Sequence, residues 1–142
     1  MGNIQLNPYL NFQGNTREAM EFYQQVLGGK LDIQTFGEVP GMDVPPGYED
    51  KVMHAMLDAD GVVIFASEGM PGAEVKFGDN VSLCLNGSAG DTDRLSEVFN
   101  ALSDGGTVMM PLEKQFWGDV FGMATDKFGV QWMVDIASEA TE

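Results

Sequence analysis

The sequence predicts an α+β protein in which two copies of one βαβββ unit form a cup-shaped open sheet. Two amphipathic helical segments, the paired glycines that end each of them, and the strand-like segments that follow lead to this prediction. Apolar positions 19, 22, 23 and 26 of the first helix recur at one constant offset as Leu95, Val98, Phe99 and Leu102. The two helical segments share their apolar spacing, their glycine stop and the strands that follow, which indicates an internal duplication. We therefore expect one domain made of two modules, residues 1–78 and 79–142.

The first module opens with an apolar, aromatic segment, residues 8–12, that is expected to be a strand. Asn15 or Thr16 is expected to cap the following helix, and Glu18 completes a capping-box pattern. Gly28-Gly29 supplies the stop, because glycine accepts positive φ without a clash of Cβ.

Three further strands are expected in the first module. Residues 31–36 alternate in polarity, and residues 52–57 and 62–67 flank an Asp60-Gly61 turn of the type that favours a hairpin. A two-residue turn there places two residue pairs on one face of the sheet, Met56 with Phe65 and His54 with Ser67.

Two irregular stretches, residues 38–51 and 69–79, interrupt this pattern. The first contains three prolines and two glycines, so it cannot form a regular element. Loops of this length are often lids or binding loops, and they are as often solvated excursions. The sequence leaves both readings open.

The second module repeats the order of the first. A strand is expected at residues 81–85, and Asp91 or Thr92 is expected to cap a helix that ends at Gly105-Gly106. Three strands are expected to close the module, at residues 107–110, 118–125 and 130–136, with a turn at 126–129 between the last two.

The charge composition excludes some classes of binding partner. The net charge is −15, with 7 basic and 22 acidic residues, and no cluster of Lys and Arg is present. Phosphate backbones and anionic lipids need such clusters, so we expect no nucleic acid and no membrane as partner. The N-terminal residues lack the pattern of a signal peptide, and a single cysteine, Cys84, fits a reducing compartment. We therefore expect a cytoplasmic protein.

Short motifs along essentially the whole chain match a known pattern. They are Pro8-Tyr9-Leu10, Glu21-Phe22-Tyr23, Val26-Leu27-Gly28-Gly29, His54-Ala55 with Leu57, Phe116-Trp117-Gly118-Asp119, and Asp126 with Phe128-Gly129 and Trp132. On these motifs the chain resembles the vicinal oxygen chelate superfamily, which includes glyoxalases, extradiol dioxygenases and bleomycin-resistance proteins. The likeness is closest to its PhnB-like branch. Lys127 departs from that branch, which usually has proline there.

The resemblance implies a cup-shaped sheet and frequent homodimers. Glyoxalases of this fold hold a divalent ion with four residues of the cup floor, and the corresponding positions here are Pro8, Phe65, Asn80 and Met133. None is a histidine or a carboxylate, and methionine sulfur suits soft ions only. We therefore expect no metal and no other cofactor.

Candidate ligand-binding residues follow from strand alternation and from the resemblance. His54 is the only histidine. On its expected sheet face it would point into the cup and act as a general base or a hydrogen-bonding group. The alternative is a partly buried histidine on the sheet face with its hydrogen bonds made and no part in binding. Phe116 and Trp117 lie where the family lines its cup mouth, or else serve core or dimer packing. The full set of expected ligand-binding residues is His54, Met56, Phe65, Ser67, Phe116, Trp117, Gln131 and Met133. No catalytic residue is assigned.

Three functions remain open on the sequence. The favoured one is a metal-independent protein that binds a small organic molecule, as bleomycin-resistance members do. The others are a metal-dependent lyase, isomerase or dioxygenase, and a non-catalytic dimeric interaction module. Ubiquinone methyltransferase, a name used in this branch, is disfavoured because no glycine-rich methyl-donor loop follows the first strand. Cys84 is expected to be a buried, unreactive thiol.

Overall fold

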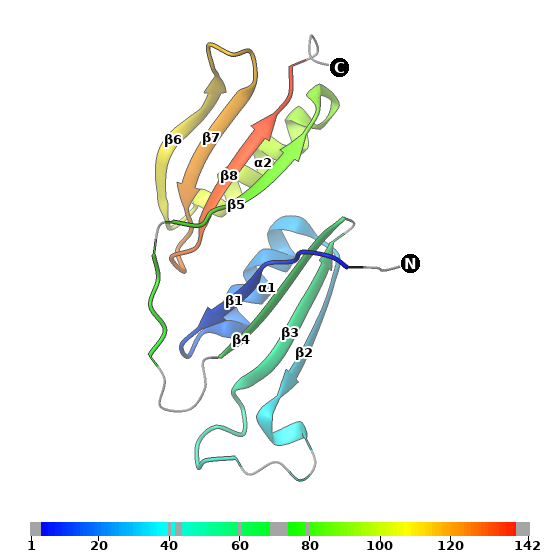
Figure 1. The fold of residues 1–142 in the computed structure, drawn as a ribbon, viewed down its shortest axis with the longest axis vertical. Helices are drawn as coiled ribbons and strands as arrows, with labels where there is room; N and C mark the ends of the chain where they lie inside the picture. The colour runs from blue at the N-terminus through cyan, green and yellow to red at the C-terminus, as the bar shows by residue number, and fades with distance from the viewer. Residues whose placement is uncertain are drawn as a thin grey trace. The chain divides into compact units, whose positions relative to one another are not determined.

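The computed structural model describes residues 4–39, 41, 44–59, 61–68, 74–78 and 80–138. The chain divides into two compact units, Met1–Lys76 (unit 1) and Phe77–Glu142 (unit 2). Each unit contains one α-helix and one four-stranded sheet, and in each the helix lies against a face of its own sheet (Figure 1). The α+β class and the duplicated βαβββ order are thereby confirmed.

Unit 1 has the strand order β1-β4-β3-β2. Strands β1 and β4 are parallel, and the other neighbours are antiparallel. Its elements are β1 (Tyr9–Phe12), α1 (Thr16–Leu27), β2 (Lys30–Thr35), the short 3-10 helix η1 (Phe36–Glu38), β3 (Val52–Ala59) and β4 (Val62–Glu68).

The predicted hairpin of unit 1 is present. Ala59 pairs with Val62 and Met56 pairs with Phe65, so only the two turn residues separate β3 from β4. The paired register ends at Ala55 and Ala66, one step before His54 and Ser67. The residue between Ala59 and Gly61 lies outside the described residues.

Helix α1 covers one face of this sheet with a stripe of buried side chains. Ala19, Tyr23 and Val26 are buried as the helical period predicts. Met20 is also buried, whereas Phe22 is half-exposed. The stripe is therefore rotated slightly toward Met20. It packs over the sheet face that carries the buried residues of the central strands, among them Ala55, Leu57, Ile64 and Ala66.

The start of α1 differs from the expected capping box. Asn15 stands at the cap position without a side-chain capping bond. Instead, the carboxylate of Glu68, at the end of β4, accepts the backbone N–H of Gly14 through Oε1 and that of Thr16 through Oε2, the latter at 3.0 Å. A helix start has N–H groups without internal partners, and a carboxylate from a neighbouring strand satisfies them as well as a local side chain.

Unit 2 has the matching order β5-β8-β7-β6, again with the outer pair β5 and β8 parallel. Its elements are β5 (Leu83–Gly87), the 3-10 helix η2 (Ala89–Asp91), α2 (Thr92–Ser103), β6 (Thr107–Lys114), β7 (Val120–Thr125) and β8 (Gln131–Ile136). Asp91 does not cap α2 through its side chain, because its Oδ2 accepts the N–H of Ser88 instead, at 3.0 Å.

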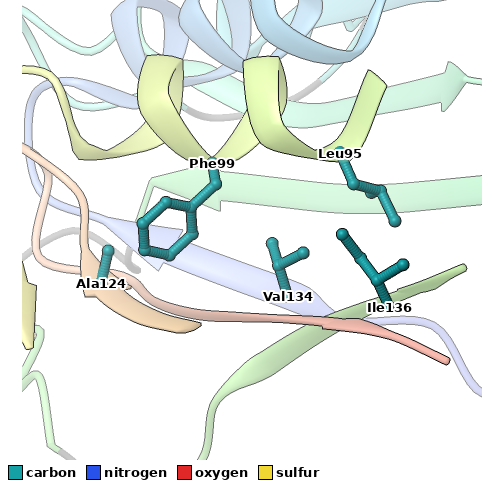
Figure 2. Close-up of a cluster of buried hydrophobic side chains, with 5 residues drawn as sticks. All are labelled: Leu95, Phe99, Ala124, Val134 and Ile136. Carbon is teal, nitrogen blue, oxygen red and sulfur yellow. The ribbon is translucent and has the colours of Figure 1, made fainter. Parts of the chain in front are cut away.

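The core of unit 2 lies between α2 and the sheet. Leu95 and Phe99 of the helix point toward Ala124, Val134 and Ile136 of the strands (Figure 2). The first two belong to the apolar stripe that the sequence predicted, which also supplies buried Val98 and Leu102.

The paired glycines fulfil a second role besides ending the helices. A Cβ atom on Gly29 would lie 2.3 Å from the carbonyl oxygen of Asp58, and one on Gly106 would lie 2.1 Å from that of Thr125. In both units the second glycine therefore lets the backbone after the helix lie directly against the strand hairpin. The duplication thus extends to backbone packing that no sequence period reveals.

Strand β6 is longer than predicted, because it continues through Pro111 to Lys114. Its pairing with β7 is irregular on both sides of Met110. Proline lacks the N–H that a ladder needs, and it is tolerated at the edge of a sheet and at bulges. Strand β6 is an edge strand and bulged, so it satisfies both conditions.

The described part of the 38–51 loop folds back on η1. The N–H groups of Phe36 and Gly37 donate to the carbonyl oxygens of Lys51 and Glu49, each at 3.0 Å. The rings of Phe36 and Tyr48 meet edge to face at 5.8 Å. These bonds tie residues 44–51 to the end of β2. Among the described residues, no helix is long and apolar enough to cross a lipid bilayer.

Candidate functional site

Each sheet has one face under its helix and one face turned away from it, which we call the distal face. In β3, Ala55, Leu57 and Ala59 are buried under α1, so His54 and Met56 lie on the distal face of unit 1. In β8, Trp132, Val134 and Ile136 are buried under α2, so Gln131 and Met133 lie on the distal face of unit 2. Trp132 was predicted on the helix side, and this placement is confirmed.

Three rings meet on the distal face of unit 1. The centroids of Tyr9 and Phe65 are 6.0 Å apart with an interplanar angle of 27°, which is a stacked arrangement. The His54 ring lies 5.5 Å from Phe65 and 6.1 Å from Tyr9. The parallel pairing of β1 with β4 brings Tyr9 opposite Phe65, and the hairpin brings His54 to the same side. Tyr9 is half exposed, so the cluster is accessible within unit 1.

Polar groups border this ring cluster. Asn11 pairs with Ser67 across β1 and β4, and the Ser67 hydroxyl donates to Oδ1 of Asn11 at 3.3 Å. The distal face of unit 1 thus gathers the predicted residues His54, Met56, Phe65 and Ser67. The sequence did not single out Tyr9 and Asn11, because a parallel pairing between segments more than 50 residues apart leaves no local pattern.

The distal face of unit 2 is lined differently. Met133 and Gln131 lie on it as the alternation predicts. The Ser82 hydroxyl donates to Oε1 of Gln131 at 3.3 Å, and Nε2 of Gln131 donates to the Gly78 carbonyl at 3.4 Å. The side chain of Gln131 is therefore held by residues that precede β5.

The two aromatic residues Phe116 and Trp117 lie in the turn between β6 and β7. Backbone bonds from Gln115 to Asp119 and from Gly118 to Gln115 close this turn. Phe116 is 96% exposed and Trp117 48% exposed, so neither belongs to the core of unit 2. Their rings meet at 4.9 Å, and Trp117 contacts Phe121 at 6.0 Å. Core packing, one of the two structural alternatives for these residues, is thereby removed.

A pair of carboxyl groups lies at the end of the same sheet. The pKa of Asp135 is raised by burial, and then by a hydrogen bond to Asp119 and by the charge of that residue. Asp119 also accepts the N–H of Ser138 at 3.3 Å. The structure thus places the carboxyl group of Asp119 beside that of Asp135.

Cys84 is not buried, contrary to expectation. It is exposed near the start of β5, on the distal face, opposite Met133. Partial burial and the charge of Asp135 raise the pKa of its thiol. A nucleophilic cysteine needs a lowered pKa, so the surroundings of Cys84 do not activate it.

The aspartate, glycine and tryptophan of the last turn have a structural role. Oδ1 of Asp126 accepts the N–H groups of Phe128 and Val130 at 2.8 and 3.1 Å, and Oδ2 accepts the indole N–H of Trp132 at 2.8 Å. Asp126 is buried, and Gly129 adopts a φ of 93° that closes the turn. The most recognisable motif of the chain therefore fixes the β7–β8 turn and does not form part of a distal face.

Two of the four expected floor positions, Phe65 and Met133, lie on the distal faces of the two units. Tyr9 faces Phe65 across β1 and β4, and Cys84 faces Met133 across β5 and β8. Two aromatic rings and a methionine thioether do not suit a hard or borderline divalent ion, and Cys84 by itself supplies one ligand where zinc sites use three or four protein ligands. Among the residues that the structure describes, no group of three His, Cys, Asp or Glu side chains is placed to hold a metal.

A depression of about 490 Å³ lies elsewhere on unit 1, at the start of α1. Its walls carry both signs of charge, including Arg17, Lys51, Glu21 and Asp50, and no aromatic side chain. Its polar walls suit water and ions better than an organic ligand.

The fold and the two distal faces define a protein of the glyoxalase/bleomycin-resistance fold, in the vicinal oxygen chelate superfamily. Within that class, residues 4–135 match the family described as 3-demethylubiquinone-9 3-methyltransferase, a PhnB-like family, and the chain belongs to it.

Solved structures agree with this assignment. Protein PA1353 from Pseudomonas aeruginosa is 42% identical with a TM-score of 0.82, and the match covers 96% of this chain and 100% of that one. A putative 3-demethylubiquinone-9 3-methyltransferase, PhnB protein, from Bacillus cereus is 25% identical with a TM-score of 0.74, over 94% and 100% of the two chains. The fosfomycin resistance protein FosX from Listeria monocytogenes shares the fold at 13% identity and a TM-score of 0.64, over 99% and 96%.

Proposed function

We propose that this protein binds a small organic molecule with a planar, apolar part, and that Tyr9, His54 and Phe65 are its principal contacts. The observation that carries this proposal is the ring cluster itself. Three rings lie within 5.5–6.1 Å of one another on a sheet face that no helix of unit 1 covers. Aromatic side chains that are left accessible in this way provide a flat surface on which a second ring stacks favourably.

Polar side chains beside the ring cluster could form hydrogen bonds with a ligand, which favours a ligand that also has a polar part. The imidazole of His54 can donate and accept hydrogen bonds, and Asn11 and Ser67 lie beside it. The Ser67–Asn11 bond occupies one donor and leaves the amide of Asn11 with two N–H donors for a ligand oxygen. Met56, opposite Phe65, adds an adaptable apolar contact.

In unit 2 we propose that four residues also contact a ligand: Gln131, Met133, Phe116 and Trp117. Met133 and Gln131 lie on the distal face, and Trp117 extends the aromatic surface that begins at Phe121. The high exposure of Phe116 and Trp117 supports contact with another molecule, because large aromatic side chains are seldom left this open without a partner.

Binding without a hard divalent ion is part of the proposal, because the donor atoms at the floor positions do not suit one. The chain also shows no glycine-rich loop for a methyl donor, which weighs against the methyltransferase activity that its family name describes. We therefore favour binding or sequestration of the ligand over its chemical conversion.

We propose a cytoplasmic homodimer, which the apolar edge strand β6 supports, since Val108, Met109 and Met110 are exposed there. Sedimentation equilibrium at micromolar protein tests this state. A mass equal to one chain at every concentration would remove the dimer from the proposal.

The binding test is a thermal-shift screen of aromatic and amphiphilic small molecules, performed in the presence of EDTA. A hit is then titrated into wild type, His54→Ala, Phe65→Ala and the control Phe77→Ala. Phe77 is 50% exposed, as Tyr9 is, but lies outside the ring cluster. We expect affinity to fall about tenfold or more in the two cluster variants, which is the effect of losing one aromatic contact. Equal affinity in all four proteins would refute the assigned site.

A further inference from the structure

Two carboxyl groups meet at one end of the distal face of unit 2. Asp135 lies in β8, and Asp119 directly precedes β7, at the end of the turn that carries Trp117. A hydrogen bond joins the two carboxyl groups. Oδ1 of Asp135 is nevertheless buried without a hydrogen-bond partner among the residues that the structure describes. Since buried polar atoms are normally paired, the carboxyl pair has an acceptor that the fold of unit 2 leaves unused.

Aromatic side chains lie beside this carboxyl pair. Asp135 pairs directly with Phe121 across β8 and β7, and both lie on the distal face. The Trp117 ring lies 6.0 Å from the Phe121 ring at an interplanar angle of 61°, and Trp117 is exposed. Glu113 of β6 faces Phe121 from the other neighbouring strand. The Phe121 ring therefore has an acidic residue on each side and an open indole next to it.

Unit 1 has no carboxyl group at the corresponding place. Asn11 pairs with Ser67 in unit 1, and Asn86 pairs with Asp135 in unit 2. The asparagine is common to both units, whereas a hydroxyl in unit 1 is replaced by a carboxyl in unit 2. The Ser67 hydroxyl bonds to Asn11 within the fold. Strand pairing at this place is thus compatible with a neutral side chain, and the acid is a feature of the sequence of unit 2.

The negative charge of the pair affects its surroundings. Burial raises the pKa of Asp135, and the hydrogen bond to Asp119 and the charge of that residue raise it further. All three causes act in the same direction, as they do where no basic side chain compensates a buried acid. The charge of Asp135 also contributes, after partial burial, to the raised pKa of the Cys84 thiol in β5. A bound cation would relieve the repulsion within the pair.

We propose that Asp119 and Asp135 bind the protonated amino group of an organic ammonium ligand, whose apolar part lies against Phe121 and Trp117. An ammonium group supplies the positive charge and also the N–H donors that free carboxylate oxygens accept. Aromatic faces attract cations and cover the adjoining carbon atoms of the ligand. The four side chains come from two neighbouring strands and the turn before β7, so a single amino group can reach both carboxyl groups.

A metal ion is a poorer occupant of this site. Hard cations take six or more oxygen ligands, usually with several from the protein. Within the described ranges, no three His, Cys, Asp or Glu side chains are placed to hold one. An ammonium group, in contrast, is satisfied by two carboxyl groups and an aromatic face.

The inference rests on the proposed function in one respect, because it assigns a chemical class to the ligand that contacts Trp117. It does not depend on the ring cluster of unit 1. The carboxyl pair and its neighbour Phe121 carry it, and none of these three residues belongs to the binding residues proposed above.

The test titrates phenethylamine, which is an ammonium ion at neutral pH, into the isotopically labelled full chain, with 2-phenylethanol as its neutral analogue. Nuclear magnetic resonance follows the amide signals and the indole N–H of Trp117. We expect one phenethylamine per chain, with shifts concentrated in β7, β8 and Trp117. The alcohol should bind at least about tenfold more weakly, because it lacks the charge.

Variants of the carboxyl pair locate the amino group. Asp119→Asn and Asp135→Asn should each weaken phenethylamine binding by about 10- to 100-fold, the fold-change that corresponds to one hydrogen bond between charged groups. Asp104→Asn is the matched control, because it removes the same charge from the exposed end of α2, away from the distal face. It should bind as wild type does. Asparagine has nearly the size of aspartate, so the variants should stay folded, and thermal unfolding verifies this.

Three results would overturn the inference: equal affinity for amine and alcohol, unchanged affinity in folded Asp135→Asn, or an equal loss in Asp104→Asn, which would indicate attraction to net charge alone. Phe65→Ala separates the inference from the proposed function, and it should leave phenethylamine binding unchanged. Loss of binding in Phe65→Ala alone would place the probe on the ring cluster of unit 1. That result would support the proposed function and overturn the ammonium site.

Discussion

The indole N–H of Trp132 donates a 2.8 Å hydrogen bond to Oδ2 of Asp126, six residues earlier in the chain. The other oxygen of the same carboxylate accepts two backbone N–H groups of the turn between β7 and β8. One buried carboxylate thus fixes the turn, the first residues of β8 and the orientation of the largest buried side chain of unit 2.

Removal of this carboxylate should cost more stability than removal of one of its donors. Asp126→Ala removes the acceptor of three N–H groups, of which those of Val130 and Trp132 are buried and that of Phe128 is part-buried, and we expect a loss of about 3 kcal/mol in the free energy of unfolding. Trp132→Phe removes only the indole N–H and some packing, and should cost about 1–2 kcal/mol. Urea denaturation measures both. Equal losses in the two variants would show that the backbone bonds of Asp126 contribute nothing.

The close packing of the backbone that follows α2 should make the protein's stability sensitive to substitution of Gly106. A Cβ on Gly106 would collide with the Thr125 carbonyl, whereas a Cβ on Gly90 has open space around it. Neither glycine has a positive φ. We expect Gly106→Ala to lower the free energy of unfolding by about 1–3 kcal/mol, as overpacking does, and Gly90→Ala to change it little. Thermal unfolding of the two variants measures the effects. A melting temperature of Gly106→Ala equal to that of wild type would contradict the prediction.

The carboxylate of Glu68 should contribute to helix α1 although it lies in another element. Glu68→Ala removes the acceptor for two N–H groups at the helix start, and the expected loss is about 1–2 kcal/mol. Asn15→Ala is the matched control, because Asn15 occupies the cap position without a capping bond. Amide hydrogen exchange at the start of α1 provides the local readout. Faster exchange in Asn15→Ala than in Glu68→Ala would reverse the assignment.

The pair Asp119 and Asp135 predicts how stability depends on pH. The pKa of Asp135 in the folded state lies above its ordinary value of 3.8. Between these two values the folded state binds more protons than the unfolded state, so the contribution of Asp135 to stability falls as pH rises through the folded pKa. Below the unfolded pKa that contribution is fully present.

Asp135→Asn tests the sign. The amide cannot ionise, so the variant should be more stable than wild type at neutral pH and should lose this advantage as the medium becomes acidic. Denaturant titrations at several pH values measure the difference. A variant that is less stable at neutral pH and gains nothing at low pH would contradict the raised pKa of Asp135.

The sequence predicted the local parts of this structure well. Helix stripes, glycine stops and the Asp60-Gly61 hairpin follow from short-range chemistry, and Met56 pairs with Phe65 as expected. The repeated βαβββ order of elements was also predicted, and it is present in both units. These features depend on hydrophobic periodicity and on turn propensities, and both can be read from short stretches of one sequence.

What the sequence did not predict depends on contacts between distant segments. Glu68 caps a helix that begins more than 50 residues earlier, and Tyr9 completes the ring cluster through a parallel pairing. The exposure of Cys84 followed from which face of β5 lies under α2, and the apolar neighbours Leu83 and Leu85 gave no sign of it. The sequence therefore named four residues of the distal face of unit 1, His54, Met56, Phe65 and Ser67. It did not name Tyr9 and Asn11, which face Phe65 and Ser67 from β1.

Calorimetry of one organic ligand with wild type and Phe65→Ala, first with EDTA and then with added manganese, separates binding to the ring cluster from binding through a metal. We expect wild type to bind equally well under both conditions and Phe65→Ala to bind about tenfold more weakly in each. Binding that appears only with manganese, or that is untouched by loss of the Phe65 ring, would contradict a metal-independent site built on the ring cluster.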